Sequence, residues 1–186
     1  RKLLGTLRNV YSFFTLYASI DCFDPGVHKI AVKDRTRMDR WLISRVNSLV
    51  AFVDSELASY HITRAARSIQ DFIIDDLSNW YVRRSRRRYW RAEMNDDKTA
   101  AYATLYEVLV RLSKLLAPFM PFVAEEIYRN LVVPADKDAP ESVHLCDYPE
   151  SEPALIDSDL EAGMLAVMRA VTLVRAGRNR SRIKVK

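Results

Sequence analysis

Apolar residues recur every three or four positions through nearly the whole chain, which is the spacing of one face of a helix. Only four glycines occur among the 186 residues, and so few argue against the many tight turns of a β architecture. The sequence therefore predicts an all-α protein folded as an antiparallel helix bundle. The expected helices cover residues 2–19, 36–57, 63–90, 97–116 and 121–131, with a last helix from residue 158 onward.

Local signals place several helix ends. The segments Thr36–Asp39 and Ser158–Glu161 both fit a capping box, in which the first and fourth residues bond to each other's backbone N–H groups. Pro121 suits the first turn of a helix, where its missing N–H is not needed. The stripe expected on the last helix consists of Leu160, Met164, Val167, Val171 and Val174.

Changes in composition divide the chain into four parts. We expect a connecting helix and loop over residues 1–38, a bundle core over 39–132, a long proline-containing surface loop over 133–156, and a basic C-terminal helix and extension over 157–186. Residues 142–145 are expected to be briefly extended, and the final Arg-Ile-Lys-Val-Lys alternates like a strand. The chain opens on an amphipathic segment without a Met, so we interpret it as a piece of a longer protein rather than as a signal peptide.

Positive charge is concentrated in two stretches that contain no acid. The segment Arg83–Arg91 holds six arginines with one tyrosine and one tryptophan, and Arg175–Lys186 carries six more positive charges. Removing these twelve charges from the formal net charge of +5 leaves −7 for the rest of the chain. Because guanidinium groups neutralise phosphates and flat rings stack on unpaired bases, the pattern favours a nucleic-acid-binding module. Single-stranded or looped RNA is favoured over duplex DNA.

The helix expected over residues 63–90 links its apolar stripe to the arginines. At about 100° per residue, the face that carries Ile69, Ile73 and Trp80 continues into arginine. The arginines on that extrapolated face are Arg83, Arg84, Arg87 and Arg91. Bare guanidinium groups cannot continue a dry interface. The helix therefore either projects beyond the bundle after Trp80 or meets an anionic partner there.

The two basic stretches supply the candidate RNA-binding residues. We expect arginines of the first stretch to neutralise phosphates, Tyr89 or Trp90 to stack on an unpaired base, and the C-terminal residues to add a second phosphate contact. The candidates are Arg83, Arg84, Arg87, Arg88, Tyr89, Trp90, Arg182, Lys184 and Lys186. Two alternatives stay open, because such runs also occur as solvated faces or as interfaces to an acidic protein, with Trp90 as an anchor.

The sequence contains no pattern of residues typical of a catalytic, metal or cofactor site. Asp76 lies on an apolar helix face and is expected to pair with an arginine of a neighbouring helix, for which Arg45 is the candidate. The three histidines lack partners at metal-ligand spacing, and the chain has no glycine-rich phosphate loop. We therefore expect no catalytic residue, metal or cofactor in this piece. Two distant cysteines indicate a reducing, cytoplasmic setting, and no apolar run is long enough to span a membrane.

Four segments together resemble a known family. They are DRWLISRVNSLV, AARSIQDFIIDDLSNWYVRRSRRRYW, LAPFMPFVAEEIY and SVHLCDYPE, and in this order they resemble isoleucyl-tRNA synthetases, which are class I enzymes. The likeness runs from about Leu3 to the end, and DLSNWYVRRSRRRYW is its most specific part. The region resembled is the helical anticodon-binding domain that follows the catalytic domain. The family's ATP-site motifs HIGH and KMSKS do not occur in the chain.

The resemblance implies a function for the longer protein and for this piece. The whole enzyme would join isoleucine to its tRNA with ATP and Mg²⁺ and would hydrolyse mischarged valine products. This piece would hold the anticodon stem-loop, would contact the catalytic domain of the same chain, and would act as a monomer. The alternatives are the equivalent domain of a valyl- or methionyl-tRNA synthetase, or a helical protein–protein docking module.

Overall fold

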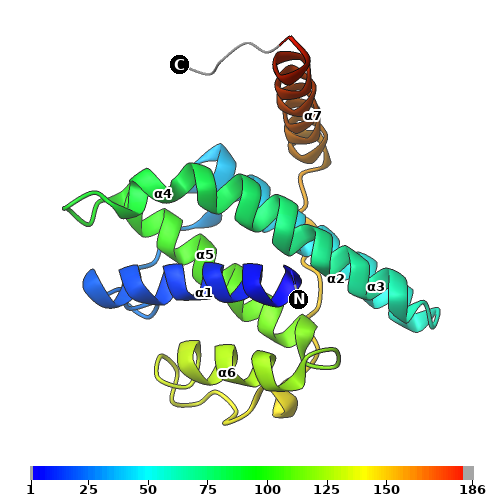
Figure 1. The fold of residues 1–186 in the computed structure, drawn as a ribbon. Helices are drawn as coiled ribbons and strands as arrows, with labels where there is room; N and C mark the ends of the chain where they lie inside the picture. Colours follow the sequence, from blue (N-terminus) through cyan, green and yellow to red (C-terminus); the bar gives the residue numbers. More distant parts are fainter. Residues whose placement is uncertain (1, 182–186) are drawn as a thin grey trace.

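The computed structural model describes residues 2–181, and they form an all-α protein (Figure 1). No strand occurs within this range, so the predicted fold class is confirmed. The main elements are α1 (Lys2–Ile20), α2 (Arg37–Ala58), α3 (Ile62–Asp71), the π-helix η2 (Phe72–Val82), α4 (Arg83–Tyr89), α5 (Asp96–Leu116), α6 (Pro121–Leu131) and α7 (Ser158–Arg180). Short 3₁₀ turns occupy η1 (Val32–Asp34), η3 (Val143–Leu145) and η4 (Pro153–Leu155).

α5 is the central helix of the bundle. It contacts α1, α2, α4 and α6, and its residues are buried on several faces. Small side chains at Ala100, Ala101 and Ala103 let neighbouring helices approach closely, while Leu105, Leu109 and similar residues fill the space between them. α7 is the exception to this packing, because it stands away from the bundle and none of its residues is fully buried (Figure 1).

α3, η2 and α4 form one continuous helical rod over residues 62–89, which lies beside α2 (Figure 1). The seam of the rod that faces the core repeats every fourth residue. Its members are Ala65, Ile69, Ile73, Leu77, Tyr81, Ser85 and Tyr89. In an α-helix, a residue four positions on is rotated by about 40°, so such a seam would drift off the core. The wider turn of the π-helix reduces this drift and keeps the seam against the core.

The π-helix therefore corrects the extrapolation made at 100° per residue. The core-facing seam continues into Ser85 and Tyr89, not into the arginines. The four residues expected to continue it are all exposed, and they are Arg83, Arg84, Arg87 and Arg91.

The predicted N-terminal ends of α2 and α6 are confirmed. The Thr36 hydroxyl accepts a hydrogen bond from the Asp39 N–H, and the Asp39 carboxylate accepts one from the Thr36 N–H, which completes the capping box. Pro121 occupies the first turn of α6. These two signals depend only on residues close in sequence, so they can be recognised without knowledge of the tertiary fold.

Two local predictions near the C-terminal half are wrong. The N-cap of α7 is Asp157 rather than Ser158, because the Asp157 carboxylate accepts a hydrogen bond from the Leu160 N–H at 2.9 Å. The segment 142–145 is not extended, since Val143–Leu145 form a 3₁₀ turn capped by Ser142. The strand predicted for residues 182–186 lies outside the described residues. No helix of the described range is both long and apolar enough to cross a membrane.

Candidate nucleic-acid interface

The predicted pairing of Asp76 with Arg45 is confirmed, and it anchors α7 as well. The Arg45 guanidinium donates two hydrogen bonds to Asp76, at 3.1 and 3.2 Å, and a third to Glu161 of α7 at 3.1 Å. Glu161 also accepts hydrogen bonds from the hydroxyls of Ser44 and Ser48. Burial raises the pKa of the Asp76 carboxyl, and Arg45 offsets this only in part. The base of α7 is thus fixed to both α2 and the rod.

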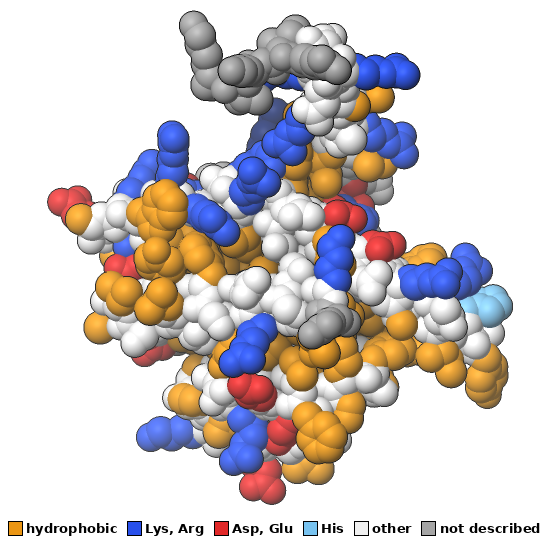
Figure 2. All heavy atoms as spheres, viewed as in Figure 1, with side chains coloured by type: hydrophobic (Ala, Val, Ile, Leu, Met, Phe, Trp, Pro, Cys, Tyr) orange, Lys and Arg blue, Asp and Glu red, His pale blue; other side chains and the backbone are white. Residues whose placement is uncertain are grey.

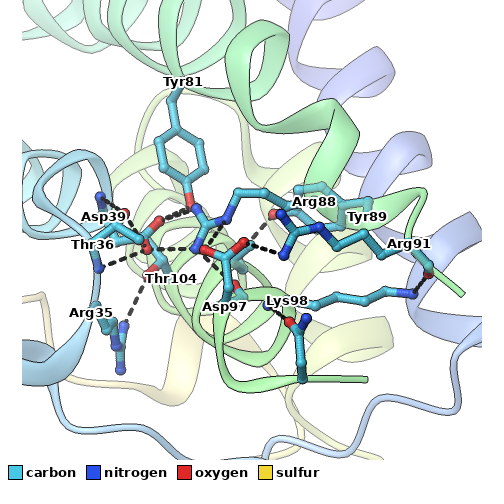
Figure 3. Close-up of polar contacts among 12 residues, drawn as sticks. Arg35, Thr36, Asp39, Tyr81, Arg88, Tyr89, Arg91, Asp97, Lys98 and Thr104 are labelled. Atoms are coloured by element: carbon cyan, nitrogen blue, oxygen red, sulfur yellow. Dashed lines mark hydrogen bonds and ion pairs between the residues drawn. The ribbon is translucent and has the colours of Figure 1, made fainter. Parts of the chain in front are cut away.

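Arg88 is largely buried, with 13% of its side chain exposed, although the sequence groups it with exposed arginines. Its guanidinium donates two hydrogen bonds of 2.7 Å to the fully buried carboxylate of Asp39, and it forms an ion pair of 2.9 Å with Asp97 (Figure 3). The Tyr81 hydroxyl donates to the same Asp39 carboxylate at 2.6 Å. Burial alone would lower the pKa of Arg88, but hydrogen bonding to Asp39 and the charges nearby outweigh it and raise the pKa.

The Arg88 cluster joins three helices, because Asp39 lies in the first turn of α2, Asp97 lies in the first turn of α5, and Arg88 belongs to α4. With its guanidinium engaged on two carboxylates, Arg88 is not available to a phosphate. We therefore correct the assignment of Arg88 as an RNA-binding residue: its position makes it a structural ion-pair partner.

Tyr89 is also inside and cannot stack on a base from this position. Only 1% of its surface is exposed, and its hydroxyl donates to the Ala101 carbonyl at 2.9 Å. Its ring packs edge-on against Tyr102 and Phe13, with centroids 4.8 and 5.0 Å away. The stacking role expected for Tyr89 is therefore corrected: the ring belongs to the core between α1 and α5.

Two further buried cations escaped the sequence analysis. The Lys98 ammonium is 1% exposed, forms an ion pair of 2.6 Å with Asp21, and donates to the Arg91 carbonyl at 2.7 Å. Arg35 pairs with Glu107 at 2.6 Å. Their partners are far away in sequence, so no local spacing could have indicated these contacts. Both hold the N-terminal segment onto α5.

The outer arginines are Arg83, Arg84, Arg86 and Arg87, and all four are exposed on α4. None of them forms an ion pair with any residue in the described range, in contrast to Arg88. The Arg84 guanidinium lies 3.2 Å from the centroid of the Trp80 ring, a cation–π contact that holds it in place. Burial and the nearby charges of Arg175 and Arg83 lower the pKa of Arg84. Arg86 was not among the residues predicted to bind RNA.

Trp90 follows the outer arginines and is open to a partner. Its side chain is 59% exposed, and its indole N–H donates to the Tyr17 hydroxyl of α1 at 2.8 Å. This hydrogen bond fixes one edge of the ring and leaves much of its surface accessible. Of the C-terminal candidates, Arg182, Lys184 and Lys186 lie outside the described residues.

Positive charge is prominent around α4 and α7. Figure 2 shows Lys and Arg side chains over α4 and along α7, on the side of the molecule where α7 stands off the bundle. No cluster of His, Cys, Asp or Glu suited to a metal ion is found within residues 2–181. A rigid helical scaffold, unpaired guanidinium groups and an exposed indole together define a helical domain suited to binding a polyanion.

Comparison with known proteins identifies the family to which this helical domain belongs. A family model described as the anticodon-binding domain of tRNA ligase matches residues 39–186, and the chain belongs to this family. The chain is similar over its length to isoleucine–tRNA ligases. It is 54% identical to that of Clostridium acetobutylicum over 99% of the chain, and 50% and 49% identical to those of Dehalococcoides mccartyi and Thermus thermophilus over 100%. The chain spans 18% of the length of each of these relatives. The family resemblance noted from the four sequence segments is thereby confirmed.

Proposed function

We propose that the chain is the part of an isoleucine–tRNA ligase that binds the anticodon stem-loop of the tRNA. The observation that carries the proposal is the set of four outer arginines, which are exposed and have no carboxylate partner among the described residues, on a domain of the anticodon-binding family. RNA phosphates would supply the missing negative charge. The high identity to isoleucine–tRNA ligases favours this enzyme over a valyl or methionyl relative.

The remaining activities are assigned to other parts of the longer protein. The whole enzyme would charge tRNA with isoleucine, using ATP and Mg²⁺, in the cytoplasm and as a monomer. We assign the binding of ATP and Mg²⁺ to those other parts, because the chain spans only 18% of the length of the isoleucine–tRNA ligases that it matches. This domain would therefore contribute to the reaction by positioning the tRNA, and not by any bond-making step.

The buried and exposed residues of α4 have separate roles in this proposal. Arg88 and Tyr89 lock the helix onto α2 and α5, so that the outer arginines project from a fixed backbone. A fixed backbone reduces the conformational entropy lost when RNA binds. The outer arginines neutralise phosphates and so set the position of the RNA, while the Trp90 ring offers an unpaired loop base a stacking surface.

Replacing the four outer arginines with glutamine is expected to weaken stem-loop binding and to flatten its salt dependence. If the four side chains neutralise about four phosphates, the logarithm of the binding constant should fall with the logarithm of salt concentration with a slope of roughly −3 to −4. The variant should make the slope shallower by about this amount and leave the contribution of phosphate contacts made elsewhere on the chain. Fluorescence anisotropy with a labelled isoleucine-tRNA anticodon stem-loop, over a series of salt concentrations, measures it.

A matched variant controls for the change in net charge. Arg8, Arg37, Arg67 and Arg129 are exposed elsewhere on the surface, and changing these four to glutamine removes the same charge. This control variant should keep a slope close to that of the unaltered chain. An unchanged slope in the outer-arginine variant would exclude these side chains as phosphate contacts and would favour the alternative of a protein docking module.

Trp90→Ala is expected to weaken stem-loop binding by roughly 1–3 kcal/mol, the usual contribution of one stacked base, while leaving the salt slope unchanged. Trp90→Phe, which keeps a flat ring, should retain most of the affinity. The other two tryptophans, Trp41 and Trp80, are only 1% and 7% exposed, so quenching of the chain's fluorescence by acrylamide reports mainly on Trp90. Bound stem-loop should protect that fluorescence. If the same protection appears with a blunt RNA duplex that has no unpaired bases, Trp90 does not stack on the loop.

A further inference from the structure

We propose that a groove between the rod and α7 holds one sugar–phosphate strand of the bound RNA, gripped by arginines on both walls. Arg83 lies on the wall formed by the rod, with Arg84 next to it on the same helix, and Arg169 and Arg175 lie on the wall formed by α7. This inference rests on the proposed function, because it names the part of the RNA and the residues of α7 that hold it. Arg175 opens the second basic stretch of the sequence, whereas Arg169 lies outside both stretches.

The groove is a large open cavity of about 830 Å³. Polar or charged groups and apolar groups both line it. Its lining residues are Asp75, Asn79, Trp80 and Arg83 of the rod, and Met168, Arg169, Val171, Thr172, Leu173 and Arg175 of α7. Blue side chains flank the space between α4 and α7 in Figure 2, where the two elements diverge. A strand of nucleic acid presents anionic phosphates together with less polar sugar faces, and this lining offers surfaces to both.

On each helix, the residues that join the two walls are followed by arginines. On α7, the half-buried stripe runs through Leu160, Met164, Met168 and Val171, and Arg175 follows one turn later. On the rod, Trp80 is followed by Arg83 and Arg84. The indole N–H of Trp80 donates to the Met164 sulfur at 3.2 Å, which joins the walls at their apolar end. Beyond this junction the walls separate, and the facing residues become arginines.

The positive charge in the groove is not balanced by the protein. Neither Arg83 nor Arg84 forms an ion pair with any residue in the range 2–181, and the same is true of Arg169 and Arg175. Asp75 is the only acid among the described lining residues, and its carboxylate accepts a long hydrogen bond of 3.4 Å from Asn79. Like charges held close together cost free energy, and a bound anion would relieve that cost.

α7 is held in place at its base and open farther along. Glu161 ties the first turn to Arg45, Ser44 and Ser48 of α2, so the orientation of the wall is fixed without RNA. No residue of α7 is fully buried, so the half that carries Arg169 and Arg175 stays accessible. The planar fork of a guanidinium matches the oxygens of a phosphate, and arginines on two walls can contact a strand from both sides.

The test is the double variant Arg169→Gln and Arg175→Gln of the 186-residue chain. We expect the salt slope for binding of the anticodon stem-loop to become shallower by between about one and two, since each phosphate contact contributes roughly 0.7–0.9. Mapping with RNA that carries ethylated phosphates should show that interference is lost at one short run of phosphates. The control is Arg8→Gln with Arg129→Gln, which removes the same charge from exposed sites elsewhere and should change neither result.

The outcomes separate the groove from the proposed function. If the double variant binds the stem-loop with the slope and ethylation pattern of the unaltered chain, the groove is not the strand site, although the domain still binds RNA. If the unaltered chain does not bind the stem-loop at all, the proposed function fails and the groove assignment fails with it. If polyglutamate displaces the stem-loop as well as unlabelled RNA does at equal ionic strength, the groove is a site for acidic protein rather than for a nucleic-acid strand.

Discussion

Asp39→Asn is expected to lower the free energy of unfolding by about 3–5 kcal/mol, the usual cost of breaking a buried ion pair from one side. Asparagine keeps the shape of the side chain but removes its charge. The guanidinium of Arg88, which donates two hydrogen bonds of 2.7 Å to this carboxylate, would lose most of its compensation. The Tyr81 hydroxyl and the start of α2 would lose a charged acceptor as well. Urea unfolding followed by circular dichroism measures the change.

Two companion variants test that reasoning. Asp54 lies on the same helix but is exposed, so Asp54→Asn should change stability by no more than about 0.5 kcal/mol. Combining Asp39→Asn with Arg88→Met should recover part of the loss, because the double variant no longer buries an uncompensated charge. A loss below about 1 kcal/mol in Asp39→Asn would contradict the view that this pair fastens α4 to the bundle.

The Arg88 pair also affects how arginine variants are interpreted. A variant that includes Arg88→Gln is expected to lose RNA binding because α4 is released from the bundle, whether or not Arg88 is near RNA. The outer-arginine variant avoids this ambiguity, since Arg83, Arg84, Arg86 and Arg87 form no ion pair with the described residues. Its effect can be assigned to the surface charge itself.

The sequence was sufficient to predict structural features that depend on residues close to one another in the chain. Helix ranges followed from apolar spacing, and the capping box of Thr36 with Asp39 followed from two residues three positions apart. The Asp76–Arg45 pair could also be predicted, because an acid on an apolar helix face needs a cation, and Arg45 lies on a helix expected to pack nearby. In each case one physical requirement restricted the possible structures or contact partners to a few.

The sequence was not sufficient to separate Arg88 from its neighbours. The six arginines of Arg83–Arg91 are chemically alike, and the partner Asp39 lies 49 residues away, in a position already explained by helix capping. The separation depends on the π-helix, whose wider turn brings Ser85 and Tyr89 toward the core and leaves the outer arginines exposed. Apolar spacing does not distinguish a π-helix from an α-helix over so short a segment.

The register of α7 shows the same limit. The predicted stripe included Val167 and Val174, but both are more than half exposed. In the structure, the half-buried stripe of α7 contains Met168 in place of Val167. One turn after Val171, the last apolar residue of this stripe, the side of α7 that faces the rod carries Arg175. Because α7 has apolar residues on several faces, its sequence alone did not indicate which face would meet the rod. The groove therefore became visible only in the structure.

Above pH about 10, the stability of the protein is expected to fall steeply because buried tyrosines keep their protons in the folded state. Burial raises the pKa of Tyr81 and of Tyr89 far above the ordinary value near 10. Below pH 10 both states hold these protons, so the two groups cause no change with pH. Above it the unfolded chain ionises and the folded one does not. Each such tyrosine therefore lowers the free energy of unfolding by about 1.4 kcal/mol per pH unit.

For Tyr81 and Tyr89 together the slope approaches about −2.7 kcal/mol per pH unit once these tyrosines are fully ionised in the unfolded chain. Burial also raises the pKa of Tyr102 and Tyr128 well above 10 and, together with Asp54, that of Tyr148 to about 12, so these tyrosines make the observed slope steeper. Urea unfolding at pH 9, 10 and 11 follows the slope as it steepens toward this limit. Because Tyr89→Phe removes one titrating group, the slope of that variant should be shallower by an amount that approaches about 1.4 kcal/mol per pH unit at pH 11, whatever its stability at neutral pH. Tyr60→Phe alters an exposed ring and serves as the matched control. An identical slope in Tyr89→Phe and the unaltered chain would mean that Tyr89 ionises as readily in the folded protein as in the unfolded chain, and is therefore not enclosed between α1 and α5.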